Sequence, residues 1–322
     1  MLPLAKRYLK GNRENMRVKV EKQIDVNTKI QSSIREKTEA VMWEKGWKAR
    51  PTFGPFVQYV CVVYEEDPYY QKIEELEKEN REIERRNEET GINIWTVRSY
   101  PEYTKEEKRE AIGYTICDVG NARCEVTVWD EYYLSLCDNC KQFFQKAPYI
   151  FVRSKKLKRL SEEKRVFADE SFLSMFVTIP MWEYLLENGI SGKGFLPAYY
   201  GKRNKELAGY QMIGSNLLER GSCRCMFFGD VRKCEVCGRT SAYYSGRSVF
   251  QNTYIDLEKV RRWDDINAVY EYCDGIRMVI LSLKMHKLLT DADPKVRMIP
   301  VFPKEMKERL DGGRKHIISD PE

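Results

Sequence analysis

The sequence predicts a mixed α/β protein, in which a small N-terminal β-α-β-α-β domain precedes two tandem units that each combine a Cys-x-x-Cys turn with a β-α-β segment. Strand-like and helix-like stretches alternate through residues 1–100. Further along the chain a strand–helix–strand pattern occurs twice, and so does a Cys-x-x-Cys motif. These observations predict three segments, which are 1–100, 101–205 and 206–322.

The N-terminal segment is predicted from two kinds of pattern. Apolar and polar residues alternate over 16–24, as they do in a half-buried strand, and 56–64 is dense in Val and Tyr, which is typical of a buried strand. A short helix should follow the segment, because Thr104 and Glu107 have the spacing of a capping box. The expected elements of the segment are strand 16–24, helix 27–47, strand 56–64, helix 68–90 and strand 92–97.

The second of these helices is long and highly charged. Asp67 and Pro68 form a typical helix start, and Gly91 can end the helix. Heptad spacing places Asn80 and Asn87 on one stripe, which two-stranded coiled coils use to set their register. Fewer than four heptads are present, so we favour a surface helix stabilised by pairs of Glu with Arg or Lys.

An internal repeat accounts for the two tandem units. Thr178 and Ser282 each end a strand-like stretch, lie 104 residues apart and can cap the helix that follows. Met181 and Met285 are separated by the same 104 residues. The pattern closes on two prolines that lie 103 residues apart, Pro197 and Pro300. We infer that one structural unit occurs twice.

Composition indicates a cytoplasmic protein. Of the 322 residues, 42% are hydrophobic, which is enough for packed cores. The 55 basic and 49 acidic side chains leave a net charge of only +6, so composition alone gives no reason for nucleic-acid binding. No apolar run reaches the roughly 20 residues of a membrane span, and the stretch after Met1 is too short for a signal peptide. We therefore expect the ten cysteines to be reduced.

Two Cys-x-x-Cys motifs predict a metal site. Cys137 and Cys140 form the first pair, and Cys234 and Cys237 form the second pair 97 residues later. One such pair supplies half of a tetrahedral thiolate shell, so two pairs can complete the four-cysteine site that zinc prefers. A shell of four thiolates leaves no position for water or substrate. We therefore expect a structural role for zinc here.

A local alternative stays open. Cys223 and Cys225 precede the second pair closely and can join Cys234 and Cys237 in a site that closes a much shorter loop. Cys-x-Cys is a tighter and less usual chelating bite, so we favour the shared site and keep Cys223 and Cys225 as reserve ligands. The remaining alternatives are reduced thiols without metal and a redox pair.

Three further stretches bear on function. The strongest positive run can meet the phosphates of a nucleic acid, although a solvated linker is the favoured interpretation. Two clusters, 129–133 and 263–265, place carboxylates beside aromatic rings, and such clusters can serve in acid–base catalysis. A pocket lined by Trp129, Asp130 or Trp263 would favour an enzyme. The basic run comprises Arg153, Lys155, Lys156, Lys158 and Arg159.

The order of these motifs resembles a known family. Thr104-x-Glu-Glu-Lys-x-x-Ala111, a Cys-x-x-Cys pair, a strand-Ser/Thr-helix stretch ending in Gly-x-x-Phe-x-Pro, a Cys-x-x-Cys-Gly motif and a second such stretch follow one another. This order resembles uncharacterised bacterial double-CxxCG motif proteins, over about residues 100–303. The β-α-β segment also looks like one seen in immunity proteins of toxin systems. The first pair departs from the pattern, because Lys141 stands where the family has glycine.

The resemblance implies zinc binding and a protein partner, and it implies no catalytic residues. Our leading hypothesis is therefore a cytoplasmic, zinc-stabilised protein that binds another protein, such as a bacterial toxin. The alternatives are a nucleic-acid-binding protein that uses the basic run and an enzyme of unknown class.

Overall fold

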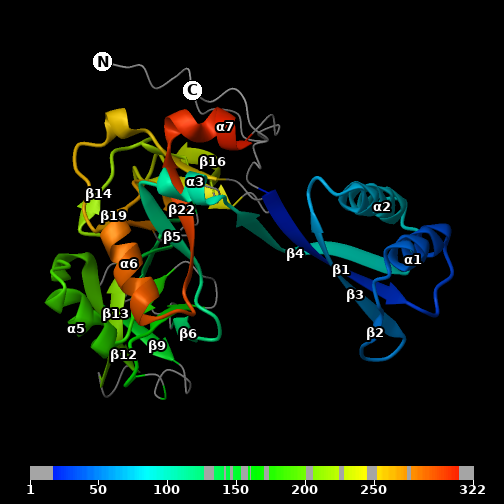
Figure 1. Cartoon of the computed structure of the whole chain (residues 1–322), viewed down its shortest axis with the longest axis horizontal. Helices are drawn as coiled ribbons and strands as arrows, with labels where there is room; N and C mark the ends of the chain where they lie inside the picture. Colours follow the sequence, from blue (N-terminus) through cyan, green and yellow to red (C-terminus); the bar gives the residue numbers. More distant parts are fainter. Residues whose placement is uncertain are drawn as a thin grey trace. The chain divides into compact units, whose positions relative to one another are not determined.

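A computed structural model of the chain contains two compact units, each of which combines helices with sheets (Figure 1). This confirms the prediction of a mixed α/β fold. The described residues up to Lys108 form the first unit, and those from Arg109 onward form the second. The structure describes residues 17–126, 134–140, 143–145, 148–153, 159, 161–169, 174–200, 206–224, 228–244, 252–273 and 277–311.

The first unit is a four-stranded antiparallel sheet in the order β2-β3-β1-β4. Helix α1 connects β1 to β2 and helix α2 connects β3 to β4, which is the split β-α-β arrangement of ferredoxin-like folds. The elements are β1 Arg17–Asn27, α1 Ser33–Lys45, β2 Arg50–Pro51, β3 Phe56–Tyr64, α2 Pro68–Glu84 and β4 Ile92–Glu102.

Both helices of the first unit pack on one face of its sheet. Every second residue of β1 is buried, from Val18 to Val26, as the alternation predicted. The buried side chains of α1 and α2 join those of the strands in a single hydrophobic core. That core consists of Ile24, Val26, Ile34, Met42, Tyr59, Cys61, Ile73, Leu76, Ile92 and Ile94.

Local signals set the start of α2 but not its predicted end. The Asp67 carboxylate accepts a hydrogen bond from the Tyr69 N–H at 2.9 Å, which confirms the predicted cap. The predicted helix 68–90 is too long, because α2 ends at Glu84. Its apolar positions stop at Ile83, and Asn87 takes a left-handed φ of 59° that no helix continues through.

The first sheet of the second unit is a closed barrel of six strands in the order β10-β11-β13-β12-β9-β6. Helix α5, Ile179–Glu187, connects β11 to β12. The interior is filled by side chains that include Phe167 and Phe176, whose rings stack 5.0 Å apart. The strands are β6 Arg123–Val126, β9 Ile150–Arg153, β10 Val166–Asp169, β11 Met175–Val177, β12 Phe195–Tyr200 and β13 Glu206–Met212.

The second sheet has seven strands in the order β14-β19-β21-β5-β22-β18-β15. Helix α6, Leu283–Ala292, connects β21 to β22. The strands are β5 Gly113–Asp118, β14 Asn216–Leu217, β15 Cys223–Arg224, β18 Thr253–Ile255, β19 Ile266–Ala268, β21 Val279–Leu281 and β22 Arg297–Pro303. Further elements of the described chain are β20 Tyr272–Cys273, η1 Gly192–Gly194, η2 Leu257–Lys259, η3 Lys304–Met306, α3 Lys105–Arg109 and α7 Lys307–Asp311.

The two sheets of the second unit share a run of five strands in equivalent order, which is β10-β11-β13-β12-β9 in the barrel and β19-β21-β5-β22-β18 in the seven-stranded sheet. In each, the strand–helix–strand segment is split by an antiparallel strand, which is β13 between β11 and β12 and β5 between β21 and β22. The registers match as well: Tyr210 lies opposite Val177 and Pro197. In the other sheet, Tyr114 lies opposite Leu281 and Pro300. The β-α-β segments predicted as a repeat therefore hold equivalent places, although their two strands are not adjacent.

This equivalence reveals an exchange of strands. Residues 113–200 and 206–303, which we name the first and second repeat, contain their elements in the same order, and each begins with its splitting strand. Yet β5 of the first repeat lies in the sheet of the second, and β13 of the second repeat lies in the sheet of the first. Each repeat therefore completes the sheet of the other, so the two cannot fold independently.

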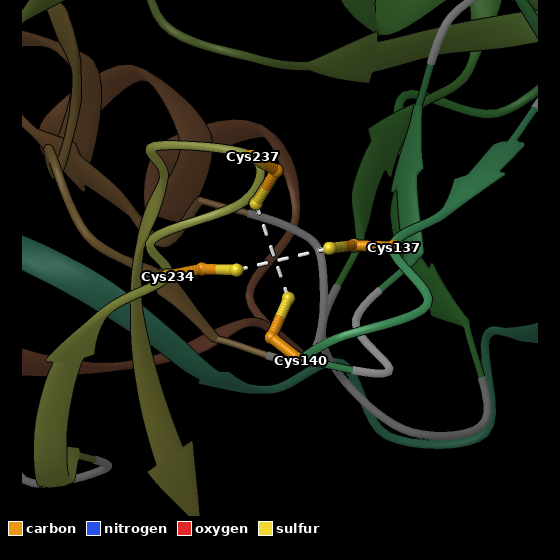
Figure 2. A group of neighbouring side chains, drawn as sticks. All are labelled: Cys137, Cys140, Cys234 and Cys237. Carbon is orange, nitrogen blue, oxygen red and sulfur yellow. Dashed lines mark hydrogen bonds between the residues drawn. The ribbon is translucent and has the colours of Figure 1, made fainter.

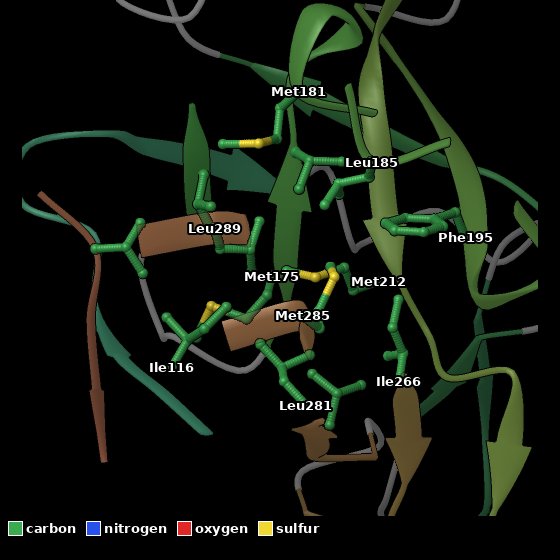
Figure 3. Close-up of a cluster of buried hydrophobic side chains, with 14 of the residues drawn as sticks. Ile116, Met175, Met181, Leu185, Phe195, Met212, Ile266, Leu281, Met285 and Leu289 are labelled. Carbon is green, nitrogen blue, oxygen red and sulfur yellow. The ribbon is translucent and has the colours of Figure 1, made fainter. Parts of the chain in front are cut away.

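One hydrophobic core serves both repeats. Met181 and Leu185 of α5 and Met285 and Leu289 of α6 belong to the same buried cluster (Figure 3). Strand residues of both sheets complete that cluster, among them Ile116 of the exchanged strand β5. The equivalent methionines that suggested a repeat in the sequence are thus among the side chains that join its two copies.

With the Asp67 cap already described, the predicted helix caps are found in three places of four. The Thr104 hydroxyl accepts from the Glu107 N–H and the Glu107 carboxylate accepts from the Thr104 N–H, which confirms the capping box. Ser282 caps α6 by accepting from the Met285 N–H at 3.1 Å. Thr178 does not cap α5, because its hydroxyl instead donates to the Glu163 carbonyl. Among the described residues, no helix is both long and apolar enough to cross a membrane.

Candidate metal centre

Two hairpins present the Cys-x-x-Cys motifs. Strands β7, Leu134–Leu136, and β8, Phe143–Gln145, flank the first motif, and β16, Phe228–Lys233, and β17, Thr240–Tyr244, flank the second. The pair that closes each hairpin is Leu136 with Phe143 and Lys233 with Thr240. In both hairpins the first residue of this pair directly precedes the first cysteine, and the second residue follows the second cysteine by three positions. The hairpins are therefore equivalent parts of the two repeats.

A glycine shapes the second turn. Gly238 follows Cys237 with a left-handed φ of 69°, and its N–H donates to the Cys234 carbonyl at 2.8 Å. The Cys234 N–H in turn donates to the Arg239 carbonyl at 2.9 Å. The chain thereby curls around the second pair of sulfurs, as the Cys-x-x-Cys-Gly pattern indicates.

The four cysteines predicted to share a site lie together (Figure 2). The sulfurs of Cys137 and Cys234 are 3.7 Å apart and those of Cys140 and Cys237 are 4.0 Å apart. All four sulfurs lie within 4.8 Å of one another. A zinc ion with four sulfurs at 2.3 Å requires sulfur–sulfur separations of about 3.8 Å. The group can therefore hold a metal ion without large movement of its sulfurs.

The surroundings favour the thiolate form that binds metals. The pKa of Cys234 is lowered to about 6, chiefly because the side-chain amide of Asn139 donates to its sulfur at 3.4 Å. Backbone N–H groups of the second turn add to this effect. The pKa of Cys137 is also lowered, mainly by the backbone N–H of Cys140.

Asn139 belongs to the candidate site and was missed by sequence reasoning. It lies between the cysteines of the first pair and reaches across to a sulfur of the second. Its counterpart in the second pair is Val236, whose side chain is exposed and apolar. Only a comparison of the two pairs position by position could have pointed to Asn139, since an asparagine in a turn is otherwise unremarkable.

The structure separates the reserve ligands from this group. Cys223 is buried in β15, where it faces Ile255 of β18, and it is not a member of the four-sulfur group. Cys225 lies outside the described residues. Within the described part of the chain, the shared arrangement of the four cysteines is therefore the one present, and the local arrangement that includes Cys223 is not.

The basic run is only partly described. Arg153 ends β9 and is exposed, and Arg159 is exposed as well. Lys155, Lys156 and Lys158 lie outside the described residues. Arg165 follows the basic run by six residues. It is buried and pairs with Asp293, so it does not extend a positive surface.

One of the two carboxylate–aromatic clusters lines a hollow of about 320 Å³ in the second unit. Asp264 is held by Arg262 and by the hydroxyl of Ser215, and Asp265 accepts from Ser282. No imidazole or thiol is among the lining residues. They are Gly189, Ile190, Ser191, Ser215, Arg262, Trp263, Asp264, Asp265, Ile266 and Ser282. Trp129 and Asp130 of the other cluster lie outside the described residues.

Comparison of the chain with protein-family models, with curated proteins and with solved structures found no match.

Proposed function

We propose that Cys137, Cys140, Cys234 and Cys237 hold one zinc ion and that this ion has a structural role. The chemistry of the donor set supports zinc, because four thiolates in a tetrahedron are its usual structural shell. The sulfur separations of 3.7 and 4.0 Å fit that shell. Each repeat supplies two of the ligands, so the ion would link the two hairpins at their turns.

We further propose that the protein acts by binding another protein. The observation that carries this proposal is the closed thiolate site: with four protein ligands, the ion has no position left for water or substrate. The motif order resembles that of double-CxxCG proteins, and the β-α-β segment looks like one seen in immunity proteins of toxin systems; this second likeness supports a bacterial toxin as the partner. The exchanged strands and the shared core also favour a rigid binding surface, which lowers the entropy lost on association.

The test uses the full, zinc-loaded chain. Proteins encoded beside its gene are expressed singly in a bacterial host, and those that stop growth are purified. We expect one of them to bind the chain in calorimetry with a 1:1 ratio and to lose its toxicity when the chain is co-expressed. If none binds and the purified chain instead turns over a substrate, the proposal is wrong.

Two alternatives have specific tests. The hollow beside Trp263 is the observation that favours an enzyme, but its carboxylates are engaged by Arg262, Ser215 and Ser282. Measurable turnover that Asp265→Asn abolishes would support this alternative. Nucleic-acid binding would appear as salt-dependent retention on DNA or RNA. Reversing the charge of Lys155, Lys156 and Lys158 without loss of that retention would refute it.

A further inference from the structure

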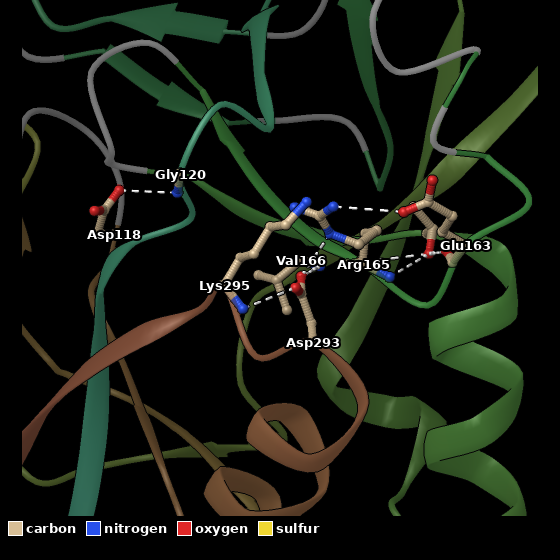
Figure 4. A network of polar contacts seen from close by, with 8 residues as sticks. Asp118, Gly120, Glu163, Arg165, Val166, Asp293 and Lys295 are labelled. Carbon is tan, nitrogen blue, oxygen red and sulfur yellow. Dashed lines mark hydrogen bonds and ion pairs between the residues drawn. The ribbon is translucent and has the colours of Figure 1, made fainter.

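Two equivalent places exist where the chain just before β10 or β19 meets the turn after the helix of the other repeat. At the first place, Arg165 at the start of β10 pairs with Asp293 in the turn after α6 (Figure 4). The Arg165 Nε donates to the Asp293 carboxylate at 2.9 Å, and the side chains are only 9% and 2% exposed. Asp293 also accepts from the N–H of Val166 at 2.9 Å. This place is therefore filled by a buried guanidinium–carboxylate pair.

The second place carries different side chains on the same backbone. The Ser282 N–H donates to the Asp265 carbonyl at 2.9 Å, just as the Thr178 N–H donates to the Arg165 carbonyl at 3.0 Å. Asp265 therefore occupies the position in the second repeat that Arg165 occupies in the first. The turn after α5 has Gly189 and Ile190 in the place of Asp293. The Asp265 carboxylate therefore replaces the Arg165 guanidinium, and Gly189 and Ile190 of the turn after α5 offer it no charged side chain.

The hollow of about 320 Å³ lies at this second place. Its volume is at the lower end of the range for ligand pockets. Asp265, Gly189 and Ile190 all line it, and Trp263 adds an aromatic wall. The hollow is thus the counterpart of the space that the Arg165–Asp293 pair occupies in the other half.

The charges around the hollow single out Asp265. Asp264 is already neutralised by two hydrogen bonds from Arg262, at 2.7 and 2.8 Å. The Lys284 ammonium contacts the Gly189 carbonyl at 3.2 Å, at the edge of the hollow. Asp265 accepts from the Ser282 hydroxyl at 2.7 Å and has no cation at ion-pair distance among the residues that the structure describes.

We propose that this hollow binds the guanidinium group of an arginine side chain presented by a protein partner. The proposal rests on the proposed protein-binding function and names the chemistry of its anchor. Asp265 would accept the guanidinium, and the chain's own Arg165–Asp293 pair provides the precedent in the equivalent place. The aromatic ring of Trp263 in the lining favours a planar cation over a compact ammonium. The Asp265 carboxylate, which has no cation of its own among the described residues, disfavours phosphates and other anions.

The experiment measures binding of a capped arginine, N-acetyl-arginine amide, to the full zinc-loaded chain by NMR titration of the tryptophan indole signals. Capped citrulline, which has the same shape without the charge, is the matched ligand control. We expect capped arginine to bind with a dissociation constant of about 1 mM, the order for a fragment of this size. Asp265→Asn should weaken binding about tenfold or more, since one charge-assisted contact is lost.

A control variant separates the hollow from general electrostatics. Asp291→Asn removes an exposed carboxylate of α6 that pairs with Lys287 outside the hollow, and it should leave binding unchanged. Equal binding of arginine and citrulline, or equal losses in the Asp265→Asn and Asp291→Asn variants, would overturn the proposal. If a toxin partner binds the chain and Asp265→Asn leaves that affinity unchanged, the anchor is wrong and the protein-binding function stands. If capped arginine binds as expected but no partner exists, only the broader function fails.

Discussion

Tyr114 and His286 stack ring on ring with their centroids 3.6 Å apart, although they belong to different repeats. The same contact occurs again between Tyr210 and Trp182, at 4.1 Å. In each pair the tyrosine comes from an exchanged strand and its partner from the helix of the other repeat. These two stacks are thus equivalent parts of one interlocked arrangement, and they explain why the second unit should unfold as a single cooperative body.

The exchanged strands require glycine beside these tyrosines. A Cβ atom at Gly113 would lie 2.7 Å from the Leu281 carbonyl oxygen, and one at Gly209 would lie 2.3 Å from the Val177 carbonyl oxygen. We expect Gly113→Ala and Gly209→Ala each to lower the free energy of unfolding by about 1–3 kcal/mol or more, as overpacking does. Urea denaturation measures the effect. Gly192→Ala is the control, because its nearest neighbour would be 3.6 Å away, and an equal loss there would refute the explanation.

The Arg165–Asp293 pair joins the repeats through buried charges. Arg165→Met leaves the Asp293 carboxylate buried without its cation, which typically costs about 3–5 kcal/mol. The exposed pair of Lys287 and Asp291 is the matched control, and Lys287→Met should change stability much less than Arg165→Met does, because solvent screens an exposed pair. Similar losses in both variants would show that the buried pair has no special role in joining the repeats.

Burial lowers the pKa of His286 below its usual 6.5. The unfolded state then binds a proton more readily than the folded state, so stability falls as the pH drops below the unfolded pKa of 6.5. His286→Phe keeps a ring against Tyr114 and removes the titrating group. We expect the variant to lose less stability than the wild type between pH 7 and pH 5 in parallel urea titrations. Parallel pH profiles would contradict this assignment.

Removal of zinc should act on the second unit alone. At free zinc about 1,000-fold above the dissociation constant, binding stabilises by about 4 kcal/mol. For a unit of this size, that corresponds to a shift of about 8–16 °C in melting temperature. The first unit has its own core and no member of the four-cysteine group, so its transition should stay in place. Calorimetry with and without a chelator resolves the two transitions, and a shift of the first-unit transition would contradict the assignment.

Sequence patterns predicted the parts of the fold that depend on local chemistry. Examples are the alternation of β1, the Asp67 cap and the Thr104–Glu107 capping box. Each depends on residues that are close together in the sequence, so the local pattern is enough to predict it. The four cysteines were predictable for a related reason, since thiolate spacing alone specifies half of a tetrahedral shell.

The exchange of β5 and β13 could not be predicted in the same way. Both strands begin their repeats and carry a Gly-Tyr pair, so the sequence shows that they are equivalent but not which sheet each completes. For β5, that choice depends on contacts between residues more than 150 positions apart, such as Tyr114 with His286. The hollow beside Asp265 was hidden for the same reason, because it becomes visible only when the two repeats are compared in space.

The most direct test of the account is the zinc content of the purified chain and of single cysteine variants. We predict about one zinc per chain, lost in Cys137→Ser and in Cys234→Ser alike, because each repeat supplies half of one shell. Cys223→Ser should keep its zinc, since Cys223 lies outside the group. Zinc retained in Cys137→Ser but lost in Cys223→Ser would contradict the shared site and the linkage of the two repeats through it.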